Sequence, residues 1–110
     1  MSQNSPQPRL VSDFAGDPDM QELVGLFVSE LPDRVAKLNA TWNQSQLGEV
    51  QRLAHQLKGA SAGYGFPTIG DAAGKLEDAL RASDAANQSS LNSLKRDLDN
   101  LIDLCSRAAA

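Results

Sequence analysis

Apolar residues recur every three or four positions along most of this chain, the period of a helix with one buried face. Four such series follow one another, and short polar stretches separate them. The first comprises Val24, Phe27, Val28, Leu31, Val35, Leu38 and Trp42. The second runs from about Leu47 to Ala62, the third contains Ile69, Ala72, Ala73, Leu76, Ala79 and Leu80, and the fourth contains Leu91, Leu94, Leu98, Leu101, Ile102 and Cys105. No segment shows the alternation of a convincing strand, so the pattern predicts an all-α protein.

Local signals indicate where these helices begin and end. Asp17 can cap the first helix and Pro18 suits its first position. Pro32 lies inside the first apolar series, where it either kinks one long helix or starts a second one, and periodicity does not choose between these. The segment 63–67, Gly-Tyr-Gly-Phe-Pro, should end the second helix, because glycine permits a left-handed residue and proline cannot continue a helix.

Four amphipathic segments joined by short turns pack most economically as an antiparallel four-helix bundle. Residues 1–16 are rich in Ser, Gln, Pro and Gly, so we expect a short, flexible N-terminal extension that can lie along the domain by Leu10, Val11 and Phe14. The domain itself is expected over residues 17–108. Its low aromatic content of 5% points to a core of Leu, Val and Ala.

The charge and cysteine content narrow the range of functions. A net charge of −4 disfavours nucleic acid and an anionic membrane surface as partners. Cys105 is the single cysteine and His55 the single histidine, so a zinc site and an internal disulfide are not expected. There is no apolar run of membrane-spanning length and no basic, apolar leader, so we expect a cytoplasmic protein without a metal or cofactor of its own.

His55 is the strongest functional candidate. Helical geometry places it roughly 140° from the centre of the apolar face formed by Val50, Leu53, Ala54, Leu57 and Ser61, so the imidazole should be exposed. Lys58 and Gly59 follow three and four positions later, on the same side of the helix. A neutral imidazole is a nucleophile at pH 7, an ammonium stabilises a phosphoryl group, and a glycine leaves room for an approaching partner.

The pattern His-x-Leu-Lys-Gly-x-Ser-x-x-x-Gly, formed by His55, Leu57, Lys58, Gly59, Ser61 and Gly65, resembles the histidine-containing phosphotransfer (HPt) domains of two-component phosphorelays. The resemblance extends from about Asp17 to Leu80 and includes the segment 27–32 and the pair Leu76-Glu77. It implies a helical bundle whose exposed histidine accepts a phosphoryl group from an aspartyl phosphate on one receiver domain and passes it to an aspartate on another.

The resemblance also implies the partners. These are receiver domains of response regulators and a hybrid histidine kinase, with Mg²⁺ and catalytic carboxylates supplied by the receiver. The chain carries no glycine-rich nucleotide-binding loop, so we expect a phosphoryl carrier without kinase activity, and a monomer. The short tails and Met1 mildly favour a free-standing protein.

Other residues around His55 are candidates for supporting roles. Gln51 and Ala62 flank His55 at helical spacing and, with Lys75, are candidates for a docking surface. Lys75 and Arg81 either reach the histidine from the adjoining helix or are simply exposed charges. Ser61 faces inward and is expected to bond a carbonyl one turn earlier. The alternative function is a helical adaptor that binds a receiver or other signalling protein without accepting phosphate, although an intact His55 argues against it.

Overall fold

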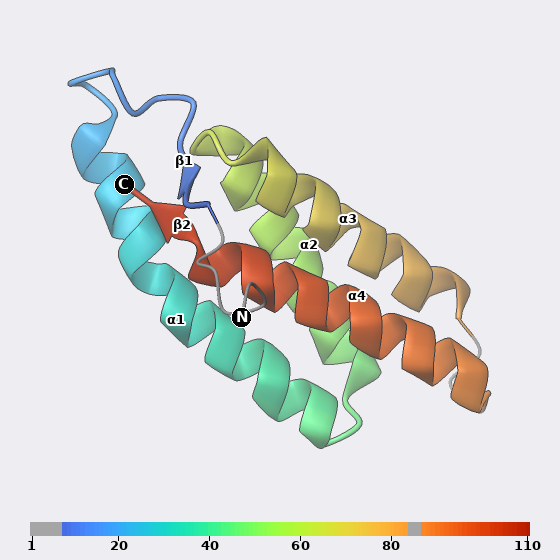
Figure 1. The fold of residues 1–110 in the computed structure, drawn as a ribbon. Helices are drawn as coiled ribbons and strands as arrows, with labels where there is room; N and C mark the ends of the chain where they lie inside the picture. Colours follow the sequence, from blue (N-terminus) through green and yellow to red (C-terminus); the bar gives the residue numbers. More distant parts are fainter. Residues whose placement is uncertain (1–7, 84–86) are drawn as a thin grey trace, which may run out of the picture.

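The computed structural model describes residues 8–83 and 87–110, and these form an up-and-down bundle of four helices (Figure 1). The helices are α1 (Gln21–Asn43), α2 (Leu47–Gly63), α3 (Pro67–Ala82) and α4 (Gln88–Ser106). Each helix runs antiparallel to the next along the chain (Figure 1). The predicted all-α four-helix fold is confirmed. Residues 1–7 of the expected flexible extension lie outside the described part of the chain.

The expected start of the first helix is wrong, and the structure answers whether Pro32 divides that helix. α1 begins at Gln21 and not at Asp17, because the Asp17 side chain is used in a preceding turn, where its Oδ1 accepts a hydrogen bond from the Asp19 amide at 2.9 Å. Pro32 does not split the first helix, since α1 continues through it to Asn43. Pro32 is exposed, so water can reach the carbonyl that the missing proline amide leaves free.

The turn between α2 and α3 follows the sequence signals closely, whereas α4 begins at Gln88, inside the polar run 87–90 after which the fourth helix was expected. Gly65 has a φ of +84°, so the turn after α2 uses the left-handed conformation that glycine allows. Pro67 then occupies the first turn of α3. Asn87 caps α4, because its side chain accepts hydrogen bonds from the amides of Ser89 at 2.8 Å and Ser90 at 3.3 Å.

Apolar side chains from all four helices, most of them aliphatic, build the core. Its largest fully buried members are Val24, Phe27, Leu38, Val50, Leu57, Ile69, Leu76, Leu94, Leu98 and Leu101. Phe27 stacks on Tyr64 with ring centroids 5.1 Å apart. Cys105 is also buried, and burial raises the pKa of its thiol to about 11, so it behaves as a protonated core residue.

The interface between α2 and α3 is the most extensive in the bundle. Glycines on α3 allow the two backbones to come close: a Cβ added at Gly70 would lie 3.4 Å from the carbonyl oxygen of Lys58 and 3.6 Å from the Cβ of Ser61. Side chains at this α2–α3 interface can therefore reach from one helix to the other directly.

A short N-terminal segment forms hydrogen bonds both to the α2–α3 turn and to the segment that follows α4. Strand β1 (Leu10–Val11) pairs in parallel with β2 (Ala108–Ala109). Next to it, the buried Ser12 donates a hydrogen bond from Oγ to the carbonyl of Tyr64 at 2.7 Å, and the Asp13 amide donates to the carbonyl of Gly65 at 2.8 Å. The sequence did not predict these strands, because two residues are too few to show an alternating pattern. Over the described residues, no helix is both long and apolar enough to cross a membrane.

Candidate functional site

His55 lies on the outer face of α2, in the middle of the helix. Its side chain is 69% exposed, whereas Ala54 beside it and Leu57 two positions later are 0% and 1% exposed. Because the helix is held down by its apolar face, the imidazole is presented to solvent on a rigid element. The exposure expected from helical geometry agrees with this placement.

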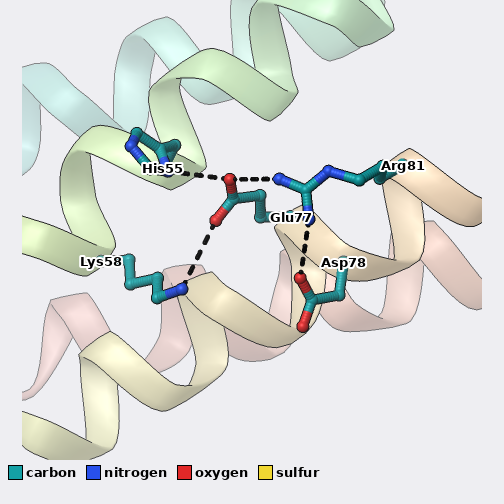
Figure 2. A network of polar contacts seen from close by, with 5 residues as sticks. All are labelled: His55, Lys58, Glu77, Asp78 and Arg81. Atoms are coloured by element: carbon teal, nitrogen blue, oxygen red, sulfur yellow. Dashed lines mark hydrogen bonds and ion pairs between the residues drawn. The ribbon is translucent and has the colours of Figure 1, made fainter.

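A carboxylate from the neighbouring helix holds one nitrogen of the imidazole ring. Nδ1 of His55 lies 2.8 Å from Oε2 of Glu77, which comes from α3 (Figure 2). An ionised carboxylate can only accept hydrogen bonds, so in the neutral ring the proton is on Nδ1 and is donated to Glu77. The second nitrogen, Nε2, then carries a free lone pair. The site therefore combines an oriented ring with a nucleophilic nitrogen.

Glu77 is buried and lies among three groups that are or can become cationic. Its side chain is only 5% exposed, yet Oε2 also receives a hydrogen bond from Nη2 of Arg81 at 2.7 Å, and Oε1 has Nζ of Lys58 at 3.9 Å (Figure 2). Burial alone would raise the pKa of Glu77, but the hydrogen bond from His55 and the charges of His55, Arg81 and Lys58 outweigh it and lower that pKa. Glu77 is thus held in its ionised form.

Lys58 reaches this carboxylate by lying across α3. A Cβ added at Gly74 would meet Cδ and Cε of Lys58 at 3.3 and 3.5 Å, so the absence of a side chain at Gly74 makes room for the lysine stem. The ammonium is too far from Oε1 for a hydrogen bond, and Oε1 has no hydrogen-bond partner among the described residues. Because the Lys58 side chain is 52% exposed, its ammonium can turn toward an anion bound at His55.

The remaining predicted site residues separate into two groups. Gly59 and Ala62 are exposed on the His55 face of α2 and Gln51 is half-buried there; a Cβ at Gly59 would meet no other atom within 4 Å. Lys75 is not brought to the histidine. It is exposed and its ammonium lies 3.7 Å from Oδ1 of Asp97 on α4, because it is two residues, or about 200°, from Glu77 around α3.

Ser61 does not do what the sequence suggested. It is completely buried against α3, as its inward position predicts, but its Oγ has no hydrogen-bond partner among the described residues. The expected bond to a carbonyl one turn earlier is therefore wrong. The small size of Ser61, next to Gly70, is what the close approach of α2 and α3 requires.

Sequence reasoning missed Glu77 and left Arg81 undecided. The signal for Glu77 was present, because position 77 falls four residues after the buried Ala73 and within the apolar series of α3. A charged residue is almost never fully buried unless it is paired. A carboxylate on the inner face of α3 therefore indicated cationic partners on α2. Over the described ranges, no group of three or more His, Cys, Asp or Glu residues could hold a metal ion.

Comparison with known proteins agrees with this geometry. The family model described as Hpt domain matches residues 22–104, which is most of the chain and includes the histidine, the lysine and the buried carboxylate. Neither a curated protein nor a solved structure matches the chain.

Proposed function

Because this chain belongs to the Hpt domain family, whose members carry phosphoryl groups in two-component signalling, we propose that His55 is its phosphoacceptor. In this proposal His55 takes a phosphoryl group from the aspartyl phosphate of one receiver domain and passes it to the aspartate of another. Members of this family are phosphoryl carriers and generally interact with receiver domains and histidine kinases. The relay between two receivers is the specific role proposed here.

The observation that carries the proposal is the hydrogen bond between His55 and the buried Glu77. It leaves Nε2 unprotonated on an imidazole that is 69% exposed. In the forward step the Nε2 lone pair forms a bond to phosphorus while the bond between phosphorus and the aspartyl oxygen breaks, and the electron pair leaves with the receiver carboxylate. The attacking ring becomes a phosphoimidazolium.

No proton has to move in this step. The proton on Nδ1 stays between the ring and Glu77, whose negative charge stabilises the positive charge that develops on the ring. In the reverse step the ring leaves phosphorus as the same neutral Nδ1–H imidazole from which it began. The arrangement therefore suits a carrier, which must accept and release a phosphoryl group with similar ease.

Lys58 is the group that stabilises the phosphoryl oxygens in this proposal. Phosphoryl transfer spreads negative charge over the non-bridging oxygens, and a nearby ammonium stabilises that charge in the transition state and in the product. In the free protein Lys58 lies beside Glu77 without a hydrogen bond, so it gives up little when it turns toward the phosphoryl group.

The open surface around His55 is the proposed docking site for the receiver. Gly59 leaves a gap one turn after the histidine, and Gln51 and Ala62 lie on the same face of α2. Mg²⁺ and the catalytic carboxylates are assigned to the receiver. A place for Lys75 in the docking surface, a monomeric state, a hybrid histidine kinase as donor and a cytoplasmic location remain predictions.

The test is phosphoryl transfer from a panel of phosphorylated receiver domains to this protein and to its His55→Gln variant. We expect label on the wild-type protein alone, and this label should be lost in acid and retained in alkali, as a phosphohistidine requires. Circular dichroism shows whether the variant remains folded. Absence of label on folded wild-type protein with every receiver would reject the proposal and favour the non-phosphorylated adaptor.

A further inference from the structure

We infer that Arg81 is a positioning residue of this site: its guanidinium fixes the Glu77 carboxylate so that His55 keeps its proton on Nδ1 and presents a free Nε2. This inference deepens the proposed function and rests on it for its consequence in phosphoryl transfer. Arg81 acts through Glu77 and is given no contact with the transferred phosphoryl group.

The geometry places Arg81 between two carboxylates of its own helix. Nη2 donates to Oε2 of Glu77 at 2.7 Å and Nη1 donates to Oδ1 of Asp78 at 3.1 Å (Figure 2). A guanidinium is planar, so two hydrogen bonds through different nitrogens fix both its position and its orientation. Asp78 thereby holds the guanidinium through Nη1, while Nη2 of the same group holds Glu77.

Arg81 and His55 bind the same oxygen of Glu77. The guanidinium nitrogen is 2.7 Å and the imidazole nitrogen 2.8 Å from Oε2. A carboxylate oxygen can accept both bonds through its two lone pairs, and the positive charge of Arg81 favours the ionised form that accepts them. The arginine therefore determines where the acceptor of the Nδ1 proton lies.

Lys58 cannot replace Arg81 in this role. It lies near the other oxygen, Oε1, at 3.9 Å, which is beyond hydrogen-bond distance. Among the described residues, the charged or titratable groups that pair with Glu77 are His55 and Lys58 from α2 and Arg81 from its own helix; α1 and α4 contribute none. Without Arg81, the buried carboxylate would lose its one hydrogen bond from a permanent cation.

The loss of that bond has two structural outcomes, and both disturb His55. The carboxylate can rotate toward Lys58, which frees Nδ1, or it can take up a proton and become a donor to Nδ1. In either case the ring moves toward the tautomer with the proton on Nε2, which a free neutral imidazole prefers. That tautomer has no lone pair available at Nε2 for attack on phosphorus.

The test is ¹⁵N NMR of the His55 ring in the unphosphorylated full chain, at about pH 8, where an ordinary imidazole is neutral. Wild type, Arg81→Gln, Arg81→Lys and Arg52→Gln are compared. Arg52 is a matched control, because it is an exposed arginine three residues before His55 that pairs with Glu49 and has no contact with Glu77. The ¹⁵N shifts report directly which nitrogen carries the proton.

We expect the Nδ1–H tautomer in wild type and in Arg52→Gln, a marked increase of the Nε2–H tautomer in Arg81→Gln, and partial recovery in Arg81→Lys. Transfer from a receiver should fall about tenfold in Arg81→Gln, the low end for losing a residue that orients a functional histidine through its hydrogen-bond partner. An unchanged tautomer ratio in folded Arg81→Gln, or a wild-type ring without preference for Nδ1–H, would overturn the inference.

The tautomer measurement separates this inference from the proposed function. If the tautomers change as expected but wild-type protein accepts no phosphate from any receiver, Arg81 positions Glu77 and the relay role fails. If wild type accepts phosphate on His55 while Arg81→Gln leaves the ring unchanged, the relay role stands and the positioning role of Arg81 fails.

Discussion

His55 and Glu77 are 22 residues apart in the sequence and lie on different helices, yet Nδ1 of one is 2.8 Å from Oε2 of the other. The exposed His55 ring is thus hydrogen-bonded to the Glu77 carboxylate, whose side chain is only 5% exposed. This pairing joins the exposed histidine to the packed interface between α2 and α3. Changes at Glu77 should therefore affect both the stability of the fold and the chemistry of the histidine.

The first prediction concerns stability at acidic pH. The pKa of Glu77 is lowered in the folded protein, so the ionised carboxylate stabilises the fold at pH values above the ordinary glutamate pKa, and this contribution is lost as the pH falls through the lowered folded value. Urea unfolding between neutral and acidic pH should show a steeper loss of unfolding free energy for wild type than for Glu77→Gln. The exposed Glu30, which lies 4.0 Å from Arg34, gives the control: Glu30→Gln should follow the wild-type curve. Parallel curves for wild type and Glu77→Gln would contradict the prediction.

The helices were predictable from the sequence because burial of one face imposes a period that extends over four or more turns. The start of α1 was not, because Asp17 and Pro18 carry the same local signals whether they begin a helix or a turn. Likewise, the tertiary contact of Leu10–Val11 with Ala108–Ala109 leaves no periodic trace in either segment.

The candidate site was predictable on α2 and only partly so beyond it. His55, Lys58 and Gly59 share one helix, so their relative placement follows from their spacing. Glu77 and Arg81 depend on how α3 is rotated and translated against α2, and this is determined by the close contacts at Gly70 and Gly74. The apolar pattern of each helix, taken separately, does not reveal how α3 is rotated and translated against α2. Lys75 illustrates the same point, because its spacing from Glu77 directs it toward α4.

The second prediction compares two lysines. Lys58→Met should slow phosphoryl transfer to His55 by about 10- to 100-fold, because it removes the ammonium that stabilises the non-bridging oxygens. Lys95→Met removes the same charge from α4, where the ammonium pairs with Asp99, and should leave the transfer rate within about twofold of wild type. Rapid-quench kinetics with one phosphorylated receiver measures both. Equal rates for the two variants would show that Lys58 contributes only general charge.

The third prediction separates stability from access at Gly59. A Cβ at Gly59 meets nothing within 4 Å, and alanine favours a helix interior over glycine, so Gly59→Ala should stabilise the protein by about 0.5 to 1 kcal/mol. The same methyl group occupies the gap beside His55, so transfer from a receiver should become slower. Gly48→Ala is the control, because Gly48 is exposed near the start of α2 with equally open space. If Gly59→Ala is stabilised and transfers at the wild-type rate, Gly59 has no role in partner access.

The fourth prediction concerns the turn that joins the two helices of the site. Gly65 has a φ of +84°, and a Cβ there would lie 2.5 Å from Oγ of Ser12 and 2.9 Å from the amide nitrogen of Asp13. Gly65→Ala should therefore destabilise the protein by about 1 to 3 kcal/mol. An alanine at this positive φ has a strained backbone, and its methyl group displaces the N-terminal segment. Gly25→Ala, in α1 with open space and no positive φ, should instead be neutral or slightly stabilising. Denaturant unfolding gives both values.

Because β1 and Ser12 hold the α2–α3 turn from outside the bundle, loss of stability in Gly65→Ala should be accompanied by faster amide hydrogen exchange at Tyr64 and Phe66. An unfolding free energy equal to that of wild type would show that the N-terminal segment moves aside without consequence for the site.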